Sequence, residues 1–195
     1  RFSPMIEKMK KFISGQISVN YRVNAGIIPK NVWIQDRTIG GGRIIGEVCH
    51  FIDTCSYLIG SEVKSVFATT INKEDKSIPD EDNVNIVLNY ANGSTATISY
   101  YAYGDNSMPK EYIEVFSSGV SMQMNDFREL TIFKGGKSSK EKSANQDKGF
   151  VNEFKAFKEA VKSGNEAISF DSIYNTTKTT FKILESIRSK SLVEV

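Results

Sequence analysis

The chain has 195 residues, which suits one large domain, and its 39% hydrophobic and 11% aromatic residues can form a substantial core. A formal net charge of +2 indicates no strong electrostatic attraction to nucleic acid, so we expect no nucleic-acid partner. No apolar run approaches the length of a membrane span and no segment resembles a signal peptide, so we expect a cytoplasmic protein without a membrane partner.

The spacing of apolar residues predicts a helix, a strand and a second helix, followed by hairpin-linked strands and two closing helices. The predicted helices cover residues 1–13, 44–59, 150–162 and 171–189. The predicted strands cover residues 16–25, 63–72, 84–90, 94–103, 111–116, 120–124 and 130–133. Short turns such as Asn92-Gly93 make neighbouring strands antiparallel. Because strands and helices are segregated, the predicted class is α+β, an open and mainly antiparallel sheet with helices on one face.

Local signals add detail to the helix ends and to the connections. Ser3 is a candidate N-cap, and Gly164 is a candidate C-terminal stop for the helix over residues 150–162. The last helix is expected to turn Phe181, Leu184 and Ile187 inward. The connections expected to be irregular, charged or mobile are residues 26–42, 73–82 and 135–148. Trp33, in the first of these, either plugs the core or stacks on a ligand.

The run Gly40-Gly41-Gly42 leads into the helix that holds the only histidine, His50. At roughly 100° per residue, Gly46, His50, Asp53 and Tyr57 share the face opposite the apolar stripe. Gly46 lies one turn before His50 and leaves open space beside the imidazole, which can exchange protons near neutral pH. Two interpretations are open for His50, a catalytic base and a structural residue.

The same stretch argues against metal binding and against a nucleotide fold. Cys49 and Cys55 lie on one predicted helix, where a disulfide would break the helix, and free thiols are typical of a reducing compartment. One histidine and two cysteines on one helix are too few ligands for zinc, so we expect no metal site. The glycine run does not match G-x-G-x-x-G, so we expect no dinucleotide-binding fold and no cofactor-binding residue in this chain.

The sequence resembles a known family around the glycine run. Gly41-Gly42 followed by His50 and Asp53 is similar to the G-G-x-x-x-D-x-x-x-H segment of the glucose–fructose oxidoreductase/inositol dehydrogenase/MocA (Gfo/Idh/MocA) family. More of the chain resembles one branch of that family, some members of which occur in polysaccharide gene neighbourhoods. The segments that match it are residues 21–26, Trp33, Asp36, 40–53, 109–111, 113–116, 126–128 and 147–149.

The resemblance implies that residues 1–195 form a single C-terminal domain for substrate binding and oligomerisation. The family's N-terminal Rossmann domain, which binds NAD or NADP and ends in a catalytic Glu-Lys-Pro motif, would lie outside this chain. Because the chain begins at Arg1 rather than at methionine, we expect it to be part of a longer protein and inactive alone. The family's open sheet commonly forms the oligomer interface, so a homodimer or homotetramer through the sheet is implied.

The implied reaction is hydride transfer between nicotinamide and a carbon of a sugar, a nucleotide sugar or a polyol. His50 matches the family histidine and would be the base that deprotonates the alcohol. The residues implied to line the substrate pocket are Tyr21, Asn24, Trp33, Asp36, Arg43 and Lys148.

The sequence departs from the family pattern at three positions, and the departures at Val32 and Phe150 motivate an alternative function. The family's aspartate falls on Gly46, which leaves the neighbouring Glu47 as either an acid–base partner of His50 or a member of a helix-surface salt bridge. Val32 and Phe150 stand where related sequences often carry histidine. The alternative function is a non-catalytic carbohydrate-binding or assembly module derived from the same fold.

Overall fold

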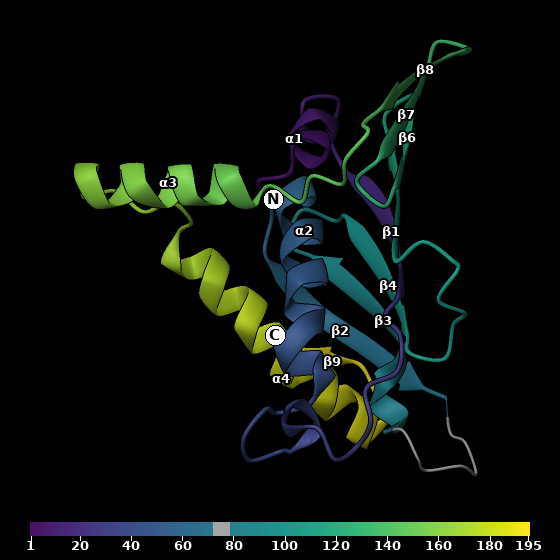
Figure 1. Ribbon diagram of the computed structural model, residues 1–195, viewed down its shortest axis with the longest axis vertical. Coiled ribbons are helices and arrows are strands. Elements are labelled where there is room, and N and C mark those ends of the chain that lie inside the picture. Colours follow the sequence, from purple (N-terminus) through teal and green to yellow (C-terminus); the bar gives the residue numbers. More distant parts are fainter. Residues whose placement is uncertain (72–78) are drawn as a thin grey trace.

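One large sheet with helices on one face organises the chain, as the computed structural model in Figure 1 shows. The structure describes residues 1–71 and 79–195, and within them the sheet has nine strands in the order β8-β7-β6-β5-β1-β4-β3-β2-β9. The strands are β1 (Ile17–Asn24), β2 (Val63–Thr70), β3 (Asn83–Tyr90), β4 (Thr95–Tyr101), β5 (Glu111–Ser117), β6 (Val120–Asn125), β7 (Glu129–Lys134), β8 (Lys137–Lys142) and β9 (Val193–Glu194). The α-helices are α1 (Pro4–Lys10), α2 (Cys49–Ile59), α3 (Phe150–Ser163) and α4 (Phe170–Ser189). The predicted α+β class is confirmed.

Strand β1 lies at the centre of the sheet and determines which side chains face the helices. It pairs antiparallel with β5, where Val19 is opposite Val115, and parallel with β4, where Tyr21 is opposite Ile98. Parallel neighbours need a long crossover, and here the chain passes through α2, β2 and β3 between the two strands. The other pairs among the described strands are antiparallel. Alternate residues of β1 are buried, as the sequence predicts.

The core lies between the inner face of the sheet and helices α1, α2 and α4. Met9 of α1 and Ile52 and Leu58 of α2 are fully buried in one cluster with strand residues such as Ile98. Helix α2 ends at Gly60, which takes a left-handed φ of 73° that side chains disfavour. This packing holds α2, and with it His50, at a defined position above the sheet.

The inward face of α4 differs from the predicted one. Phe181 is 52% exposed, whereas Leu184 and Ile187 are partly buried against the core. The buried positions of α4 hold three threonines, Ile183 and Ser186, and Ser186 Oγ accepts a hydrogen bond from the Ala68 backbone nitrogen at 2.9 Å. The prediction for Phe181 is wrong because the face of α4 that packs on β2 is the one that carries Ile183 and Ser186.

The segment predicted to be mobile, residues 135–148, instead contains strand β8. Gly135 and Gly136 take positive φ angles of 59° and 72°, which suit the tight turn of a two-residue hairpin. Lys140 of β8 then pairs with Glu129 of β7 at 2.8 Å. Charged side chains on an edge strand discourage further strand pairing, so the polar composition indicates an edge rather than a loop.

Two other predicted boundaries change. The first helix is shorter than predicted. Ser3 is its N-cap residue, as predicted, but the Ser3 hydroxyl donates to the Asp147 carbonyl at 2.7 Å and forms no capping bond with the helix. The predicted strand end at residue 72 and residues 73–78 of the predicted charged loop 73–82 lie outside the described residues. In the rest of that loop, Asp80–Asp82 forms a short 3₁₀ turn.

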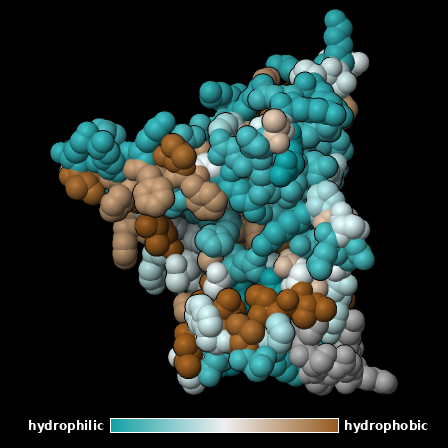
Figure 2. All heavy atoms as spheres, viewed as in Figure 1, coloured by the Kyte–Doolittle hydropathy of each residue, from teal (hydrophilic) through white to brown (hydrophobic). Residues whose placement is uncertain are grey.

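Helix α3 projects from the body of the molecule (Figure 1), and none of its side chains is buried. The predicted helix and its end at Gly164 are confirmed, but its apolar stripe faces outward, with Phe154 73% exposed. Figure 2 shows hydrophobic side chains gathered on this projection. We call this patch the arm surface, and it comprises Phe150, Val151, Phe154, Phe157 and Val161 of α3 with Phe170 and Tyr174 of α4.

Candidate active site

The glycine run lets the loop after β1 pack tightly before the helix begins. A Cβ atom on Gly40 would lie 2.5 Å from both the Ile34 Cα and the Trp33 carbonyl oxygen. Gly41 and Gly42 take φ angles of 74° and 81°. Because the loop itself fills the space around Gly40, the run does not form an open cradle for phosphate.

The helix that follows begins with a π-helical turn, Ile44–Val48, and becomes α-helical at Cys49. The helix predicted over residues 44–59 is therefore confirmed in its bounds, and its first turn is π-helical rather than α-helical. A π turn is wider than an α turn and is frequent at functional sites. Here it carries Gly46 and Glu47 immediately before His50.

His50 has an exposed side chain and lines a cavity of about 410 Å³, which we call the His50 cavity. The cavity walls come from α2, β1, the start of β5, the turn after β6 and the segment before α3. The other lining residues used below are Arg1, Tyr21, Glu47, Glu111, Phe127 and Lys148. The imidazole thus faces a cavity rather than the hydrophobic core.

Glu47 is an ionised anchor beside His50. Its carboxylate accepts hydrogen bonds from Lys110 Nζ at 2.7 Å, from Arg43 Nη2 at 2.8 Å and from the Tyr100 hydroxyl. Burial alone would raise the pKa of Glu47, but these hydrogen bonds outweigh it and lower the pKa to about 2. A carboxylate that stays ionised at neutral pH does not donate a proton there, so the geometry favours the ion-pair interpretation of Glu47.

Tyr21, Glu111 and Lys148 form a hydrogen-bonded chain in the wall of the His50 cavity. The Tyr21 hydroxyl donates to one Glu111 oxygen, and Lys148 Nζ donates to the other at 2.6 Å. Burial, together with the Glu111 charge, raises the pKa of Tyr21 well above 10, so the phenol stays a neutral donor. Glu111 is only 4% exposed and was not predicted as a site residue. Its strand alternation with Ile113 was the available signal, because it places Glu111 on the inward face.

Close backbone packing holds Lys148 in this wall. Gly149 takes a φ of 85°, and a Cβ atom there would lie 2.2 Å from the Phe2 carbonyl carbon. Lys148 Nζ also lies 5.5 Å from the centre of the Phe127 ring, within cation–π range. The segment before α3 is therefore tied to the start of the chain, and Lys148 lines the His50 cavity. Its predicted contact with substrate stays a prediction.

The polar face predicted for the helix is partly covered by Arg1. Arg1 Nε donates to Asp53 at 2.9 Å, and its guanidinium lies 5.7 Å from the centre of the Tyr57 ring. The Asp53 carboxylate is thereby paired with a guanidinium at the rim of the His50 cavity, and His50 is an exposed side chain of this face.

A neighbouring cavity of about 370 Å³, which we call the Trp33 cavity, is lined by Trp33, Arg43, Gly46, Glu47 and Lys110. Trp33 is exposed, so it does not plug the core, and its role in stacking on a ligand stays a prediction. Gly46 leaves open space, as predicted, since a Cβ atom there would have the Gly40 oxygen as its nearest neighbour, at 3.9 Å.

Arg43, which lines the Trp33 cavity, is held by several groups of the protein itself. Its side chain is 3% exposed, and its guanidinium donates to the Ala25 and Gly26 carbonyls as well as to Glu47. The guanidinium also lies 5.0 Å from the centre of the Tyr100 ring. These contacts give Arg43 a structural role, and its predicted contact with substrate stays a prediction.

Asn24 and Asp36, also predicted to contact substrate, stabilise loops. Asn24 Nδ2 donates to the Asp105 and Met108 carbonyls at 2.8 and 3.1 Å. Asp36 Oδ1 accepts from the Thr38 backbone nitrogen and hydroxyl, each at 2.7 Å. Neither residue lines the His50 cavity, but Asn24 lines the larger cavity described below, and the predicted substrate contacts of both residues stay predictions.

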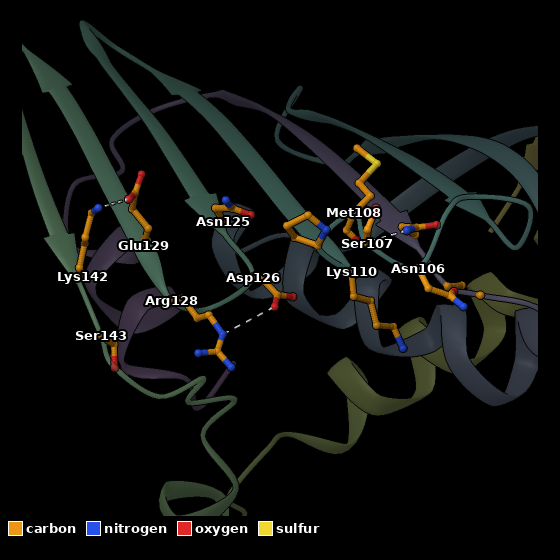
Figure 3. Close-up of a pocket in the computed structure, with 14 residues that line it drawn as sticks. Asn106, Ser107, Met108, Lys110, Asn125, Asp126, Arg128, Glu129, Lys142 and Ser143 are labelled. Atoms are coloured by element: carbon orange, nitrogen blue, oxygen red, sulfur yellow. Dashed lines mark hydrogen bonds and ion pairs between the residues drawn. The ribbon is translucent and has the colours of Figure 1, made fainter.

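A third cavity, of about 640 Å³, lies where several strands end, and Figure 3 shows it in close-up. Its walls come from the end of β1 with residues 25–26, the 106–110 loop, the turn between β6 and β7, and the end of β8. We call it the strand-end cavity. Sequence reasoning did not predict it as a cavity, because it forms only when these four segments come together.

The described residues offer neither a metal-binding cluster nor a membrane-spanning helix. They contain no group of three or more histidine, cysteine, aspartate or glutamate side chains placed to hold a metal ion. No α-helix in residues 1–71 or 79–195 is long and apolar enough to cross a membrane. Cys49 and Cys55 are both unpaired.

Solved structures with a similar fold are oxidoreductases. Levoglucosan dehydrogenase, solved with NADH and levoglucosan, has a TM-score of 0.80 at 19% identity over 100% of this chain and 64% of its own. An aldose–aldose oxidoreductase from Caulobacter crescentus, complexed with glycerol, has a TM-score of 0.78 at 20% identity over 98% of this chain and 59% of its own. A UDP-N-acetylglucosamine 3-dehydrogenase from Acidithiobacillus ferrooxidans has a TM-score of 0.77 at 14% identity, over 97% and 59%.

These TM-scores establish a shared fold, and the chain spans about three fifths of the length of these proteins. A search of curated proteins found no match. The family model described as GFO/IDH/MocA C-terminal domain matches residues 13–121, more than half of the chain. The chain belongs to the Gfo/Idh/MocA family of oxidoreductases, in the part that corresponds to its C-terminal domain.

Proposed function

We propose that this chain is the substrate-binding and oligomerisation domain of an NAD(P)-dependent oxidoreductase that acts on a sugar, a nucleotide sugar or a polyol. The observation that carries the proposal is the exposed imidazole of His50 in a cavity that also holds the ionised Glu47 and the neutral donor Tyr21. A cavity with separate donors and acceptors suits a ligand rich in hydroxyl groups.

We assign the proton-transfer step of such a reaction to residues of this chain. Oxidation of an alcohol removes a hydride from carbon and a proton from oxygen, and His50 is the group that takes the proton. The Tyr21 hydroxyl donates to one oxygen of Glu111, and Lys148 Nζ donates to the other. These bonds fix the positions of the charged groups in the wall of the His50 cavity while a substrate binds. Glu47 keeps Lys110 at the cavity edge.

The nicotinamide, when bound, supplies the hydride acceptor, and we assign its binding to a Rossmann domain outside this chain. The glycine run supports that assignment, because Gly40 packs on its own loop and leaves no phosphate cradle. The arm surface gives a second reason, since Phe150 belongs to it and also lines the His50 cavity. A domain packed on the exposed side of α3 (Figure 2) would therefore also close the cavity.

The outer face of the sheet is our proposed oligomer interface. Phe67 of β2 and its cross-strand partner Val87 of β3 are both exposed on the face away from the helices, and Phe116 and Phe133 are exposed further along the sheet. Exposed apolar residues on a flat sheet face are typical of a surface that another subunit covers. We propose a homodimer or homotetramer.

The test replaces His50 in a protein that carries this chain together with its nucleotide-binding domain. We expect His50→Ala to lower turnover by at least roughly tenfold, because general-base catalysis contributes about that much or more. Cys49→Ala, which changes the preceding residue of the same helix, is the matched control and should leave turnover unchanged. Equal turnover in both variants would remove His50 from the mechanism. Sugar binding without any hydride transfer in the unchanged protein would instead favour the non-catalytic module.

A further inference from the structure

The strand-end cavity is a larger and more polar space than the His50 cavity, and the proposed reaction leaves it unused. It is lined by side chains that can donate and accept hydrogen bonds, as Figure 3 shows for Asn106, Asn125, Asp126, Arg128 and Lys142. The side-chain amides of Asn106 and Asn125 form no hydrogen bond with the other described residues, so both amides are available to a ligand.

The charges of this cavity are balanced rather than of one sign. Lys142 Nζ lies 3.4 Å from Glu129, and Arg128 Nε lies 4.0 Å from Asp126. Lys110, at the boundary of the cavity, is paired with Glu47 outside it. Phosphate and carboxylate groups are bound through charge-assisted hydrogen bonds from cations, and the cations named here already face carboxylates of the protein. Free amides next to paired charges match hydroxyl groups instead, because a hydroxyl both donates and accepts.

The strand-end cavity and the His50 cavity share a wall. Lys110 lines both, and in the turn after β6 Asp126 and Arg128 line the strand-end cavity while Phe127 lines the His50 cavity. The wall is fixed by paired backbone contacts, since Asp126 N donates to the Glu111 carbonyl at 2.8 Å and Glu111 N donates to Asp126 Oδ1 at 3.3 Å.

The turn that builds this wall is conformationally unusual. Asp126 and Phe127 take φ angles of 51° and 55°, and Arg128 N donates to the Asn125 carbonyl at 2.9 Å, which closes a two-residue turn. Left-handed backbone at both central positions normally selects asparagine and glycine. A buried phenylalanine there is held by its surroundings, and such strained residues concentrate where ligands are bound.

We propose that the strand-end cavity is a second carbohydrate subsite, which binds an uncharged, hydroxyl-rich group attached to the reacting sugar across Lys110. The substrate class is then a glycoside or an oligosaccharide rather than a free monosaccharide. The inference rests on the proposed function in one respect, that the reacting sugar occupies the His50 cavity.

The test is a binding titration of the isotope-labelled 195-residue chain, followed by NMR on the side-chain amide groups of Asn106 and Asn125. The probes are glucose, cellobiose, maltose, lactose, glucose 1-phosphate and UDP-glucose. We expect at least one disaccharide to shift both amide signals and to bind roughly tenfold more tightly than glucose, a gain of about 1.4 kcal/mol. Because binding is measured without cofactor or turnover, a failure here is distinguishable from a failure of the proposed reaction.

Variants locate the effect. Asn106→Ala, on an exposed loop, and Asn125→Ala should each reduce the disaccharide advantage over glucose to about twofold or less, which is below half a kcal/mol. Gln123→Ala is the control, because Gln123 lies on β6 together with Asn125. Its side-chain amide donates a hydrogen bond to Glu114, outside the cavity. Tighter binding of glucose 1-phosphate or UDP-glucose than of every disaccharide would overturn the proposal in favour of an anion site. Absence of any disaccharide shift at concentrations on the order of 20 mM, a range that detects even millimolar affinity, would overturn it outright.

Discussion

Lys110 Nζ donates to Glu47 Oε1 at 2.7 Å at the point where three cavities meet. Lys110 lines the His50, Trp33 and strand-end cavities, and Glu47 lines the first two. The lysine comes from the end of the 106–110 loop and the glutamate from the π-helical turn, so this pair joins the two segments that frame the site. Its loss is expected to affect stability and ligand binding together.

Replacing the carboxylate tests this junction. Glu47→Gln leaves the buried Arg43 guanidinium and Lys110 without their counter-charge, and we expect a loss of about 1–3 kcal/mol in the free energy of unfolding at pH 7. Urea unfolding followed by circular dichroism measures it. Glu129→Gln, which changes an exposed pair with Lys140, is the control and should alter stability far less. Equal losses in the two variants would contradict a special role for Glu47.

The pH dependence of stability gives a separate prediction for Glu47. Its pKa of about 2 in the folded chain lies below the ordinary value of 4.5, so the ionised form contributes stability that is fully present above pH 4.5. That contribution should be lost as the pH falls from 4.5 towards 2. We expect Glu47→Gln to flatten the stability profile in this window, relative to the unchanged chain, in unfolding measured at successive pH values. Parallel profiles would show that other carboxylates dominate acid unfolding.

Gly46 should accept the aspartate that the family pattern places there. Its backbone φ is not left-handed, and a Cβ atom would meet only the Gly40 oxygen, at 3.9 Å. We expect Gly46→Asp to leave the melting temperature unchanged or to raise it slightly, since glycine costs about 1 kcal/mol in a helix relative to alanine and aspartate costs less. Gly40→Ala is the contrast, because its Cβ would lie 2.5 Å from backbone atoms, and it should destabilise clearly.

The two glycines that flank α3 separate backbone strain from steric contact. Both take left-handed φ angles, 85° at Gly149 and 73° at Gly164, but a Cβ at Gly149 would lie 2.2 Å from Phe2, whereas Gly164 has open space around it. We expect Gly164→Ala to cost about 1 kcal/mol of unfolding free energy and Gly149→Ala roughly 1–3 kcal/mol more, because overpacking adds to strain. Thermal unfolding of the two variants is the measurement. Equal costs would mean that the contact between Gly149 and Phe2 relaxes freely.

The proposed assembly can be tested on the outer face of the sheet. Phe67→Lys combined with Val87→Lys places two charges on adjacent strands of that face, and we expect light scattering to show a shift from dimer or tetramer to monomer. Phe154→Lys on α3 changes an equally apolar residue of the arm surface and should leave the assembly intact. A monomeric unchanged chain at high concentration would reject the interface.

Several features follow from the sequence because their causes are local. The alternation of Val19 and Tyr21 in β1 predicts an inward face, and Gly164 predicts the end of α3. The glycine run before His50 predicts a helix start with unusual backbone angles. Period and turn chemistry act over a few residues, so the order of the main elements is readable without coordinates, whereas the edge strands β8 and β9 were not predicted.

Other features depend on which segments meet in space. The sequence alone does not distinguish Arg43, which bonds to the chain's own carbonyls, from Lys148, which lines the His50 cavity. The pairing of β5 with β1 brings Glu111 into the site. Phe181 lies outside the core because another face of α4 packs against β2. The sequence by itself therefore determines the elements and the exposed imidazole's place on its helix. The tertiary structure decides the partners of each polar group, because hydrogen bonds and burial depend on distances between residues far apart in the chain.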